Sequence, residues 1–431
     1  MNIRRNRRIA ITGVGPLTSI GVGKKELWKS ILQKRQGVSY EKFYLGKDYL
    51  GSAHIYKIKN LDIGKFGINK KILNEINVWR KGKKSSDLNF FLATIKLALD
   101  DSEYDVGNGS KTGVILTHEQ PDGEQFFSDL IDKSFDFIKQ KGDLSKKEYF
   151  ELLNNTFSRD VYNQQTFMPL FQVAKVFGVH GYSLFINNAC ASGLYAMEIA
   201  CQLIRSNLLN TVIVSAVDNS GLLRSIWMRE NNLYSSDGRI RPFSLDRNGF
   251  VCGQGGAALI LEDLEYAKRR GAYIYAEYVG GRFVLESWKV AFPNILENYY
   301  VGIIKEVLKE NHILPKNIDL INAHGVATNL IDQYEAKAIR QVFGKTNCNV
   351  MVNALKPYIG HTLGASGLLE IAILLIGMKK GALVPTLNVD PIDTKLKLNV
   401  VTKLKKAHLK TILKLSCGFG GFDGAVILKK T

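Results

Sequence analysis

Apolar and polar positions follow two different periods along this chain. Apolar residues that recur every three to four positions predict helices, and short apolar runs bounded by glycine or charge predict buried strands. The predicted helices are 25–32, 87–100, 194–204, 297–310, 332–343 and 367–375. The predicted strands are 9–14, 112–116, 182–186, 250–261, 272–279, 318–323 and two runs within 413–428. This alternation of strand and helix favours a layered α/β fold.

Two long segments do not fit that alternation. Residues 37–80 mix turn and charge signals, and residues 119–165 are polar, charged and aromatic. We expect 119–165 to form helices outside the main sheet. The chain has no apolar run of about 18 residues, so no membrane span is expected. The arginine-rich start, 1–8, leads into a short strand and not into the apolar stretch of a secretory signal.

Composition bounds the class of protein and its partners. The 431 residues are 45% hydrophobic, enough for a sizeable core. The cysteines at 190, 201, 252, 348 and 417 show no metal-ligand spacing, which favours reduced thiols and a cytoplasmic location. The formal charge of +18 predicts an acidic partner, for which nucleic acid, an anionic membrane and an acidic carrier protein all qualify. A lysine-rich genome would explain the same charge, because the lysines are dispersed.

Three short motifs occur in the same order in both halves of the chain. They are Ala-Ser-Gly-Leu at 191–194 and 365–368, Cys-Gly-x-Gly-Gly at 252–256 and 417–421, and a strand-to-glycine stretch at 11–15 and 321–325. We therefore predict a duplicated α/β unit with halves 1–265 and 266–431. Equivalent turns of a duplicated fold can converge on one site, and Cys190, His324, His361 and Phe419 lie on or beside these turns.

The chemistry most easily assigned is that of Cys190. It lies between a predicted strand and a predicted helix, with small residues around it. A thiol near a helix N-terminus is favoured as the nucleophilic thiolate. The competing interpretation is a small buried cysteine with no chemical role.

Two of the seven histidines, His324 and His361, lie in glycine-flanked turns after apolar segments. No carboxylate and histidine spacing typical of a metal site accompanies them, so acid–base or oxyanion roles are preferred and no metal is expected.

These motifs together resemble the elongating β-ketoacyl-[acyl-carrier-protein] synthases, condensing enzymes of the thiolase superfamily. The resemblance spans nearly the whole length. It is carried by 11–15, 189–193, 241–243, 246–250, 322–325, Asp332, Glu335, 353–356, 360–362 and 418–421. It implies a thiolase-like fold of duplicated βαβαβαββ halves in a five-layer αβαβα core, with 119–165 as a helical insertion in the first half.

The resemblance also implies a ping-pong reaction. An acyl chain passes from an acyl carrier protein to Cys190, and decarboxylative Claisen condensation with malonyl-carrier protein gives a 3-oxoacyl-carrier protein. No cofactor is bound permanently, because the carrier brings its own phosphopantetheine. Housekeeping fatty-acid elongation and specialised type II polyketide or polyene elongation are both open. A homodimer is expected, and a heterodimer with a related ketosynthase-like subunit is possible.

Further roles follow from the same resemblance. His324 and His361 would donate hydrogen bonds to the malonyl thioester oxygen. Lys356 would order the site through Glu335 and the histidine turns. The N–H groups of Cys190 and Phe419 would form the oxyanion hole, and the Phe419 ring would gate the acyl pocket.

Several positions depart from the family pattern. Val326 replaces a threonine that contacts the pantetheine arm, whereas Thr328 keeps the second such position. Asn188 and Gln254 replace a threonine and a glutamate, and the segment 288–293 lacks the usual His-x-Thr-x-Pro texture. These departures favour an unusual acyl chain, carrier or partner.

Three other classes of function were weighed. A chain-length-factor-like partner without activity usually lacks the cysteine that is present here. A nucleic-acid-binding protein is disfavoured by dispersed charge and the absence of a binding motif. A cysteine hydrolase would use Cys190 with one histidine and would leave the second histidine unexplained.

Overall fold

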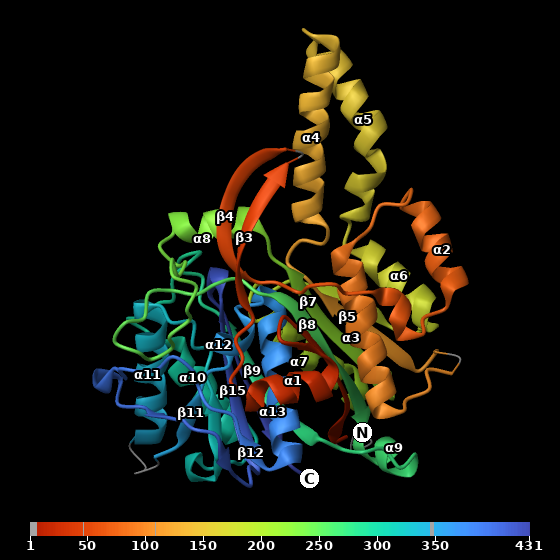
Figure 1. Ribbon diagram of the computed structural model, residues 1–431. Helices are drawn as coiled ribbons and strands as arrows, with labels where there is room; N and C mark the ends of the chain where they lie inside the picture. The colour runs from red at the N-terminus through yellow and green to blue at the C-terminus, as the bar shows by residue number, and fades with distance from the viewer. Residues whose placement is uncertain (1–6, 46, 108, 345–348) are drawn as a thin grey trace.

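The computed structural model describes residues 7–45, 47–107, 109–344 and 349–431. Its main sheet has twelve strands within those ranges (Figure 1). Five from the first half lie in the order β1 (Ile9–Thr18), β8 (Gln254–Asp263), β7 (Thr211–Asn219), β5 (Thr112–Thr117) and β6 (Ser183–Ile186). From the second half come β9 (Ala276–Leu285), β16 (Phe422–Lys429), β15 (Thr411–Gly418), β10 (Leu320–Asn322), β11 (Met351–Asn353) and β13 (Asn399–Val400). The short β2 (Gly21–Val22) pairs with β1.

Strand pairing repeats between the halves. In each half the first three strands pair antiparallel, and the last two add in parallel: β1–β8–β7–β5–β6 matches β9–β16–β15–β10–β11. The two units join where Ile9 and Ile11 of β1 pair with β9. The predicted duplication is therefore confirmed, with one correction. The stretch 11–15 corresponds to β9 and not to 321–325, whose true counterpart follows β5.

Three apolar clusters separate five layers. One lies outside the first five strands under α3 (Ser86–Ser102). A second lies outside the other strands under α10 (Tyr299–Glu310) and α11 (Asn329–Phe343). The largest encloses α7 (Ser192–Arg205) and α13 (Ser366–Lys380), which pack together at the centre. Helix, strands, central helices, strands and helices thus follow one another, as the αβαβα prediction requires.

The two central helices explain the repeated Ala-Ser-Gly-Leu motif. A Cβ on Gly193 would lie 3.1 Å from Leu368 Cβ, and a Cβ on Gly367 would lie 3.1 Å from the Leu194 side chain. Each glycine therefore allows the leucine of the other helix to approach closely. This crossing holds the turns that precede α7 and α13 beside each other, and those turns carry Cys190 and His361.

Two hairpins extend from the layered body (Figure 1). One is made of β3 (Val38–Leu45) and β4 (Asp48–Tyr56), inside a segment that the sequence left undefined. The other is made of α4 (Gly123–Lys141) and α5 (Lys146–Asn163), which confirms helices in 119–165. Lys83 forms ion pairs with Asp129 and Asp160 at the base of the helical hairpin.

The remaining elements complete the layers and their connections. They are α1 (Gly23–Leu32), α2 (Lys70–Trp79), α6 (Phe167–Phe177), α8 (Leu222–Glu230), α9 (Leu264–Arg269), α12 (Lys356–Ile359), β12 (Ala382–Leu383), β14 (Lys405–Lys406) and short 3₁₀ turns, including η6 (Phe419–Gly421). Among the described residues, no helix combines the length and apolar character needed to cross a membrane.

Some predicted bounds were wrong for local reasons. β8 begins at Gln254 instead of residue 250, because Cys252 and Gly253 form isolated bridges with His361 and Tyr56. α11 begins at Asn329 and not at 332, because the Thr328 hydroxyl accepts a hydrogen bond from Ile331 N and caps the helix.

Candidate active site

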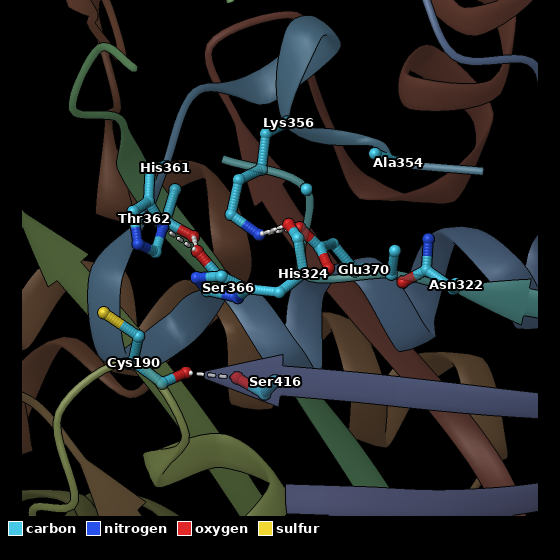
Figure 2. Close-up of polar contacts among 12 residues, drawn as sticks. Cys190, Asn322, His324, Ala354, Lys356, His361, Thr362, Ser366, Glu370 and Ser416 are labelled. Atoms are coloured by element: carbon cyan, nitrogen blue, oxygen red, sulfur yellow. Dashed lines mark hydrogen bonds and ion pairs between the residues drawn. The ribbon is translucent and has the colours of Figure 1, made fainter. Parts of the chain in front are cut away.

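The turn between β6 and α7 holds Cys190 in a constrained geometry. Ala189 has a left-handed φ of 48°, which places the cysteine on a sharp bend. The Ser192 hydroxyl donates to Ala189 O at 2.6 Å and accepts from Asn188 N at 2.8 Å. Ser416 Oγ, on β15, donates to Cys190 O at 3.1 Å and ties the turn to the second half (Figure 2).

The protonation of Cys190 differs from the prediction of a favoured thiolate. Burial raises the pKa of its thiol, and the charge of Glu119 raises it further. Lys356 and the Phe419 N–H act in the opposite direction on that pKa, but they are the weaker influences. Cys190 precedes the N-cap residue Ala191, so the thiol lies one residue outside the helix end, where the dipole is less effective.

His324 and His361 face each other near the thiol (Figure 2). Their ring centroids are 5.3 Å apart with the planes at 81°. Burial is the main cause that lowers the pKa of both imidazoles well below the usual value, and Lys356 lowers both further. Both rings are therefore neutral near pH 7, and each carries one N–H that can donate. His361 Nδ1 lies 2.8 Å from Ser366 Oγ, the first residue of α13.

A buried ionic network fixes the histidine turn. Lys356 Nζ donates to His324 O at 2.6 Å and to Glu370 Oε1 at 2.8 Å (Figure 2). Lys414 on β15 contacts the other oxygen of Glu370. The carboxylate partner of Lys356 is thus Glu370 and not the predicted Glu335.

Glu335 acts on the same turn from the other side. Its two carboxylate oxygens accept hydrogen bonds from His324 N at 2.6 Å and Gly325 N at 2.7 Å. Asp332, one turn earlier on α11, accepts from Ala327 N at 3.1 Å and Phe243 N at 2.8 Å. Burial raises the pKa of Asp332 to about 7. Backbone hydrogen bonds to side chains of one helix therefore determine where His324 lies.

Phe419 lies between Gly418 and Gly420 and lines the cavity at the thiol. Its ring meets the Trp227 ring edge-on, with centroids 5.2 Å apart. Gly420, with a left-handed φ of 76°, donates from its N–H to Val290 O at 2.6 Å. The segment 288–293, which departs from the family pattern, thus lies directly against the Phe419 turn.

The cavity itself is about 20 Å³, room for about one water molecule. Its lining comes from both halves and includes Cys190, Phe250, Pro293, His324, Val326, His361 and Phe419. Val326 reaches this cavity, whereas the Thr328 hydroxyl is engaged as the α11 cap.

The predicted residues Cys190, His324, His361, Val326 and Phe419 all line this cavity. Several side chains that support them were not predicted from the sequence. These are Trp227, Glu370, Lys414, Ser366 and Ser416. A signal existed for two of them. Glu370 and Lys414 are lone charges within otherwise apolar runs, and a buried charge needs a partner of opposite sign. Among the described residues, no group of three or more potential ligands is arranged to hold a metal ion.

The fold and site together define a class, that of acyltransferases of the condensing type. Models of the β-ketoacyl synthase N-terminal and C-terminal domains match residues 6–267 and 287–390. The chain belongs to the β-ketoacyl synthase family.

Individual relatives and solved structures are similar over the whole length. A 3-oxoacyl-[acyl-carrier-protein] synthase of Schizosaccharomyces pombe, named as putative and mitochondrial, is 28% identical over 98% of this chain and 99% of that protein. The ishigamide ketosynthase/chain length factor structure has a TM-score of 0.83 at 23% identity, covering 99% of this chain and 100% of the other. A type II polyketide ketosynthase, solved with its acyl-carrier protein and bound to the hexaketide, has a TM-score of 0.82 at 27% identity, covering 99% and 100%. The thiolase-like fold is thereby confirmed.

Proposed function

We propose that this chain carries out decarboxylative condensation of an acyl group, held on Cys190, with malonyl-acyl carrier protein, giving a 3-oxoacyl-acyl carrier protein. One observation carries the proposal. A buried thiol and two neutral imidazoles from different halves line the same cavity.

In the first half-reaction the Cys190 sulfur attacks the acyl thioester carbonyl. The new S–C bond forms as the bond to the pantetheine sulfur breaks, and the thiol proton leaves with that sulfur. The N–H groups of Cys190 and Phe419 would stabilise the oxyanion. The Phe419 N–H acts to lower the pKa of the Cys190 thiol, which supports this role.

In the second half-reaction the malonyl thioester loses CO2, and negative charge collects on its carbonyl oxygen. Neutral His324 and His361 would donate hydrogen bonds to that oxygen. The carbanion then attacks the acyl-enzyme carbonyl, a carbon–carbon bond forms, and Cys190 leaves as thiolate. Lys356 and Glu335 act as positioning residues, since both hold the His324 backbone.

The carrier protein would present its phosphopantetheine past Val326 and Thr328. The net charge of +18 suits an acidic carrier. Pantetheine would find a methyl-lined wall at Val326, so one hydrogen bond usual for the family would be lost there.

Assembly, domain division and location complete the proposal. We expect a homodimer, or a heterodimer with a related subunit, and β6 offers an edge strand of the sheet for such pairing. The division into 1–265 and 266–431 and the cytoplasmic location stay predictions.

Intact-mass analysis tests the first half-reaction. Incubation with acyl-carrier protein should add one acyl mass to the wild-type chain and none to Cys190→Ala. Equal acylation of the wild-type chain and of Cys190→Ala would refute the assignment of Cys190 as the nucleophile.

Release of CO2 from malonyl-carrier protein tests the second half-reaction. His324→Ala and His361→Ala should each slow it by at least about 100-fold, the scale of one lost oxyanion donor. The chain-length-factor alternative predicts neither acylation nor CO2 release from the isolated chain.

A further inference from the structure

Several buried polar atoms gather where β5 and β7 end. The buried atoms without a hydrogen bond are Thr117 Oγ1, His118 Nε2, Glu119 Oε1, Asp218 Oδ2, Ser220 Oγ and, from the neighbouring α3, Asp87 Oδ1. Nearly all buried polar atoms in proteins have a hydrogen-bond partner, so a group of exceptions at one place needs a reason. Because β5 and β7 are parallel, with Thr117 opposite Ala216, their next residues meet at one edge. That edge is where ligands bind in α/β sheets.

A polar cavity of about 160 Å³ adjoins this cluster. Its lining includes Lys84, Asp87, Asp122, Glu124, Asn219 and Gly221. Asp87 is only 4% exposed, and its unpartnered Oδ1 belongs to a residue of the cavity wall. Its other oxygen accepts from Asp122 N at 2.5 Å and contacts His118.

Carboxylates outnumber cations at this cavity and cluster. Five carboxylates, of Asp87, Glu119, Asp122, Glu124 and Asp218, lie with the permanent cations Arg80, Lys84 and Arg224. His118, in contact with Asp87, adds a further positive charge when protonated: burial lowers its pKa, but the charges of Asp87 and Asp218 raise it above the usual value overall. Both arginines are already engaged: Arg80 with Asp122 at 2.7 Å, and Arg224 with Asp218. Burial, together with the charge of Asp218, raises the pKa of Glu119 to about 7. The free atoms are mostly acceptors, so the matching ligand group is a hydrogen-bond donor, and an ammonium fits best.

Helix α8 has residues near both the polar cavity and the cavity at the thiol. Met228 packs in the same apolar cluster as Cys190, and Trp227 contacts the Phe419 ring. One turn earlier, Arg224 joins the ionic cluster, and Gly221 at the helix start lines the polar cavity. From Met228 to Gly221 the helix spans about 10 Å, within reach of a medium-length acyl chain.

We propose that the acyl chain on Cys190 extends along α8, past Phe419, and that its far end carries an amino or hydroxyl group bound at Asp87 and Glu119. The substrate class is therefore a polar-ended acyl chain and not a saturated hydrocarbon. This inference rests on the proposed function, because it needs the acyl-enzyme at Cys190. A hydrocarbon end would cover the free carboxylate oxygens without pairing them, which is unfavourable.

Rates of Cys190 acylation by three carrier-bound chains of equal length test the proposal. The chains are octanoyl, ω-hydroxyoctanoyl and ω-aminooctanoyl, each followed by intact mass, with acetyl as a short reference. We expect the amino chain to transfer at least about tenfold faster than octanoyl, with the hydroxy chain between them. Octanoyl transfer as fast as that of the amino chain would overturn the inference. If acetyl is transferred but the amino chain is not preferred over octanoyl, the inference fails and the proposed condensing function stands. If no chain is transferred from any carrier, both the inference and the proposed function are refuted.

Substitutions then locate the preference. Asp87→Asn and Glu119→Gln should each reduce the amino-to-octanoyl rate ratio by about tenfold, since an amide keeps the shape but loses the charge. The matched control is Asp100→Asn on the same helix; the Asp100 side chain is 59% exposed and forms an ion pair with Lys96. The amino-to-octanoyl rate ratio of this variant should not change. Two independent variants keep the test decisive if one fails to fold. An unchanged ratio in the folded variant would overturn the assignment.

Discussion

The proposed condensation step depends on two histidines that stay neutral. Burial, reinforced by Lys356, lowers the pKa of both His324 and His361. Each imidazole is therefore protonated only at a pH well below the usual pKa of histidine. We expect CO2 release from malonyl-carrier protein to hold from about pH 7.5 down to about pH 6, below the ordinary histidine pKa of about 6.5. Cys190→Ala isolates this step from acylation, and a pH series of the initial rate measures it. A decline that begins at about pH 6.5 would contradict the neutral assignment.

The control for that prediction is Lys356→Met. It removes a cation that lowers both pKa values while Lys414 remains paired with Glu370. The acid limb of the pH profile should then shift upward. A purely structural role for Lys356 would lower the rate at every pH and leave the limb in place.

Glu370 is the residue whose loss should cost most stability. It is fully buried and balances two buried lysines, Lys356 and Lys414. Glu370→Gln should lower the free energy of unfolding by about 3–5 kcal/mol, because uncompensated charge stays in the core. Urea denaturation measures the change. Glu306→Gln, which removes an exposed pair with Arg282, should cost about 1 kcal/mol or less. Equal costs for the two variants would show that the network adds no stability.

The crossing of helices α7 and α13 brings the turns of the candidate site together. Gly193→Ala would place a Cβ 3.1 Å from Leu368 Cβ, so the helices must separate slightly. We expect a loss of about 1–3 kcal/mol in unfolding free energy and slower acylation of Cys190 at the adjoining turn.

A glycine in another helix provides the opposite control. Gly302 in α10 has no atom within 4 Å of an added Cβ. Gly302→Ala should therefore stabilise the protein by about 0.5–1 kcal/mol, through helix propensity alone. Thermal melts of both variants compare the signs. Stabilisation by Gly193→Ala would mean that the helices do not need this close contact.

Elements with one strong periodicity could be predicted from the sequence, and those defined by distant partners could not. α3, α7 and α13 have apolar faces or runs that predict a helix, and their predicted bounds were wrong by one to five residues. The β3–β4 hairpin stayed undefined because its residues are mostly half-exposed and polar. The stretch 11–15 was matched to the wrong repeat because glycine texture alone does not encode strand order.

The residues of the candidate site likewise include some that the sequence could predict and some that it could not. Reactive side chains in glycine-flanked turns, such as Cys190, His324 and His361, carried a local signal. The partner of Lys356 did not, because Glu370 lies fourteen residues away on another element and only packing makes the pair. The predicted thiolate at Cys190 was wrong because burial, which raises the pKa of the thiol, depends on the whole fold. The helix end, in contrast, can be predicted from the sequence.

The excess positive charge of the molecule should affect how fast it meets the carrier protein. With a net charge of +18, encounter with an acidic carrier should be accelerated electrostatically and screened by salt. We expect kcat/KM for acyl-carrier protein to fall by about tenfold or more between about 50 mM and about 500 mM NaCl. A carrier-free pantetheine thioester is the matched control and should show little salt dependence. Equal salt dependence of the two substrates would contradict recognition of the carrier by charge.

The joining of two repeated units at one site has a consequence for how the enzyme matures. The turn that carries Cys190 and the turns that carry His324 and His361 are more than 130 residues apart in the sequence, and the Ser416 hydroxyl holds the Cys190 turn by a hydrogen bond. Contacts of such long separation form slowly and late. A ribosome-bound chain that already contains Cys190 therefore has a thiol without its imidazoles. We therefore expect the proposed site to become complete only after β15 and β16 have inserted between β10 and β9.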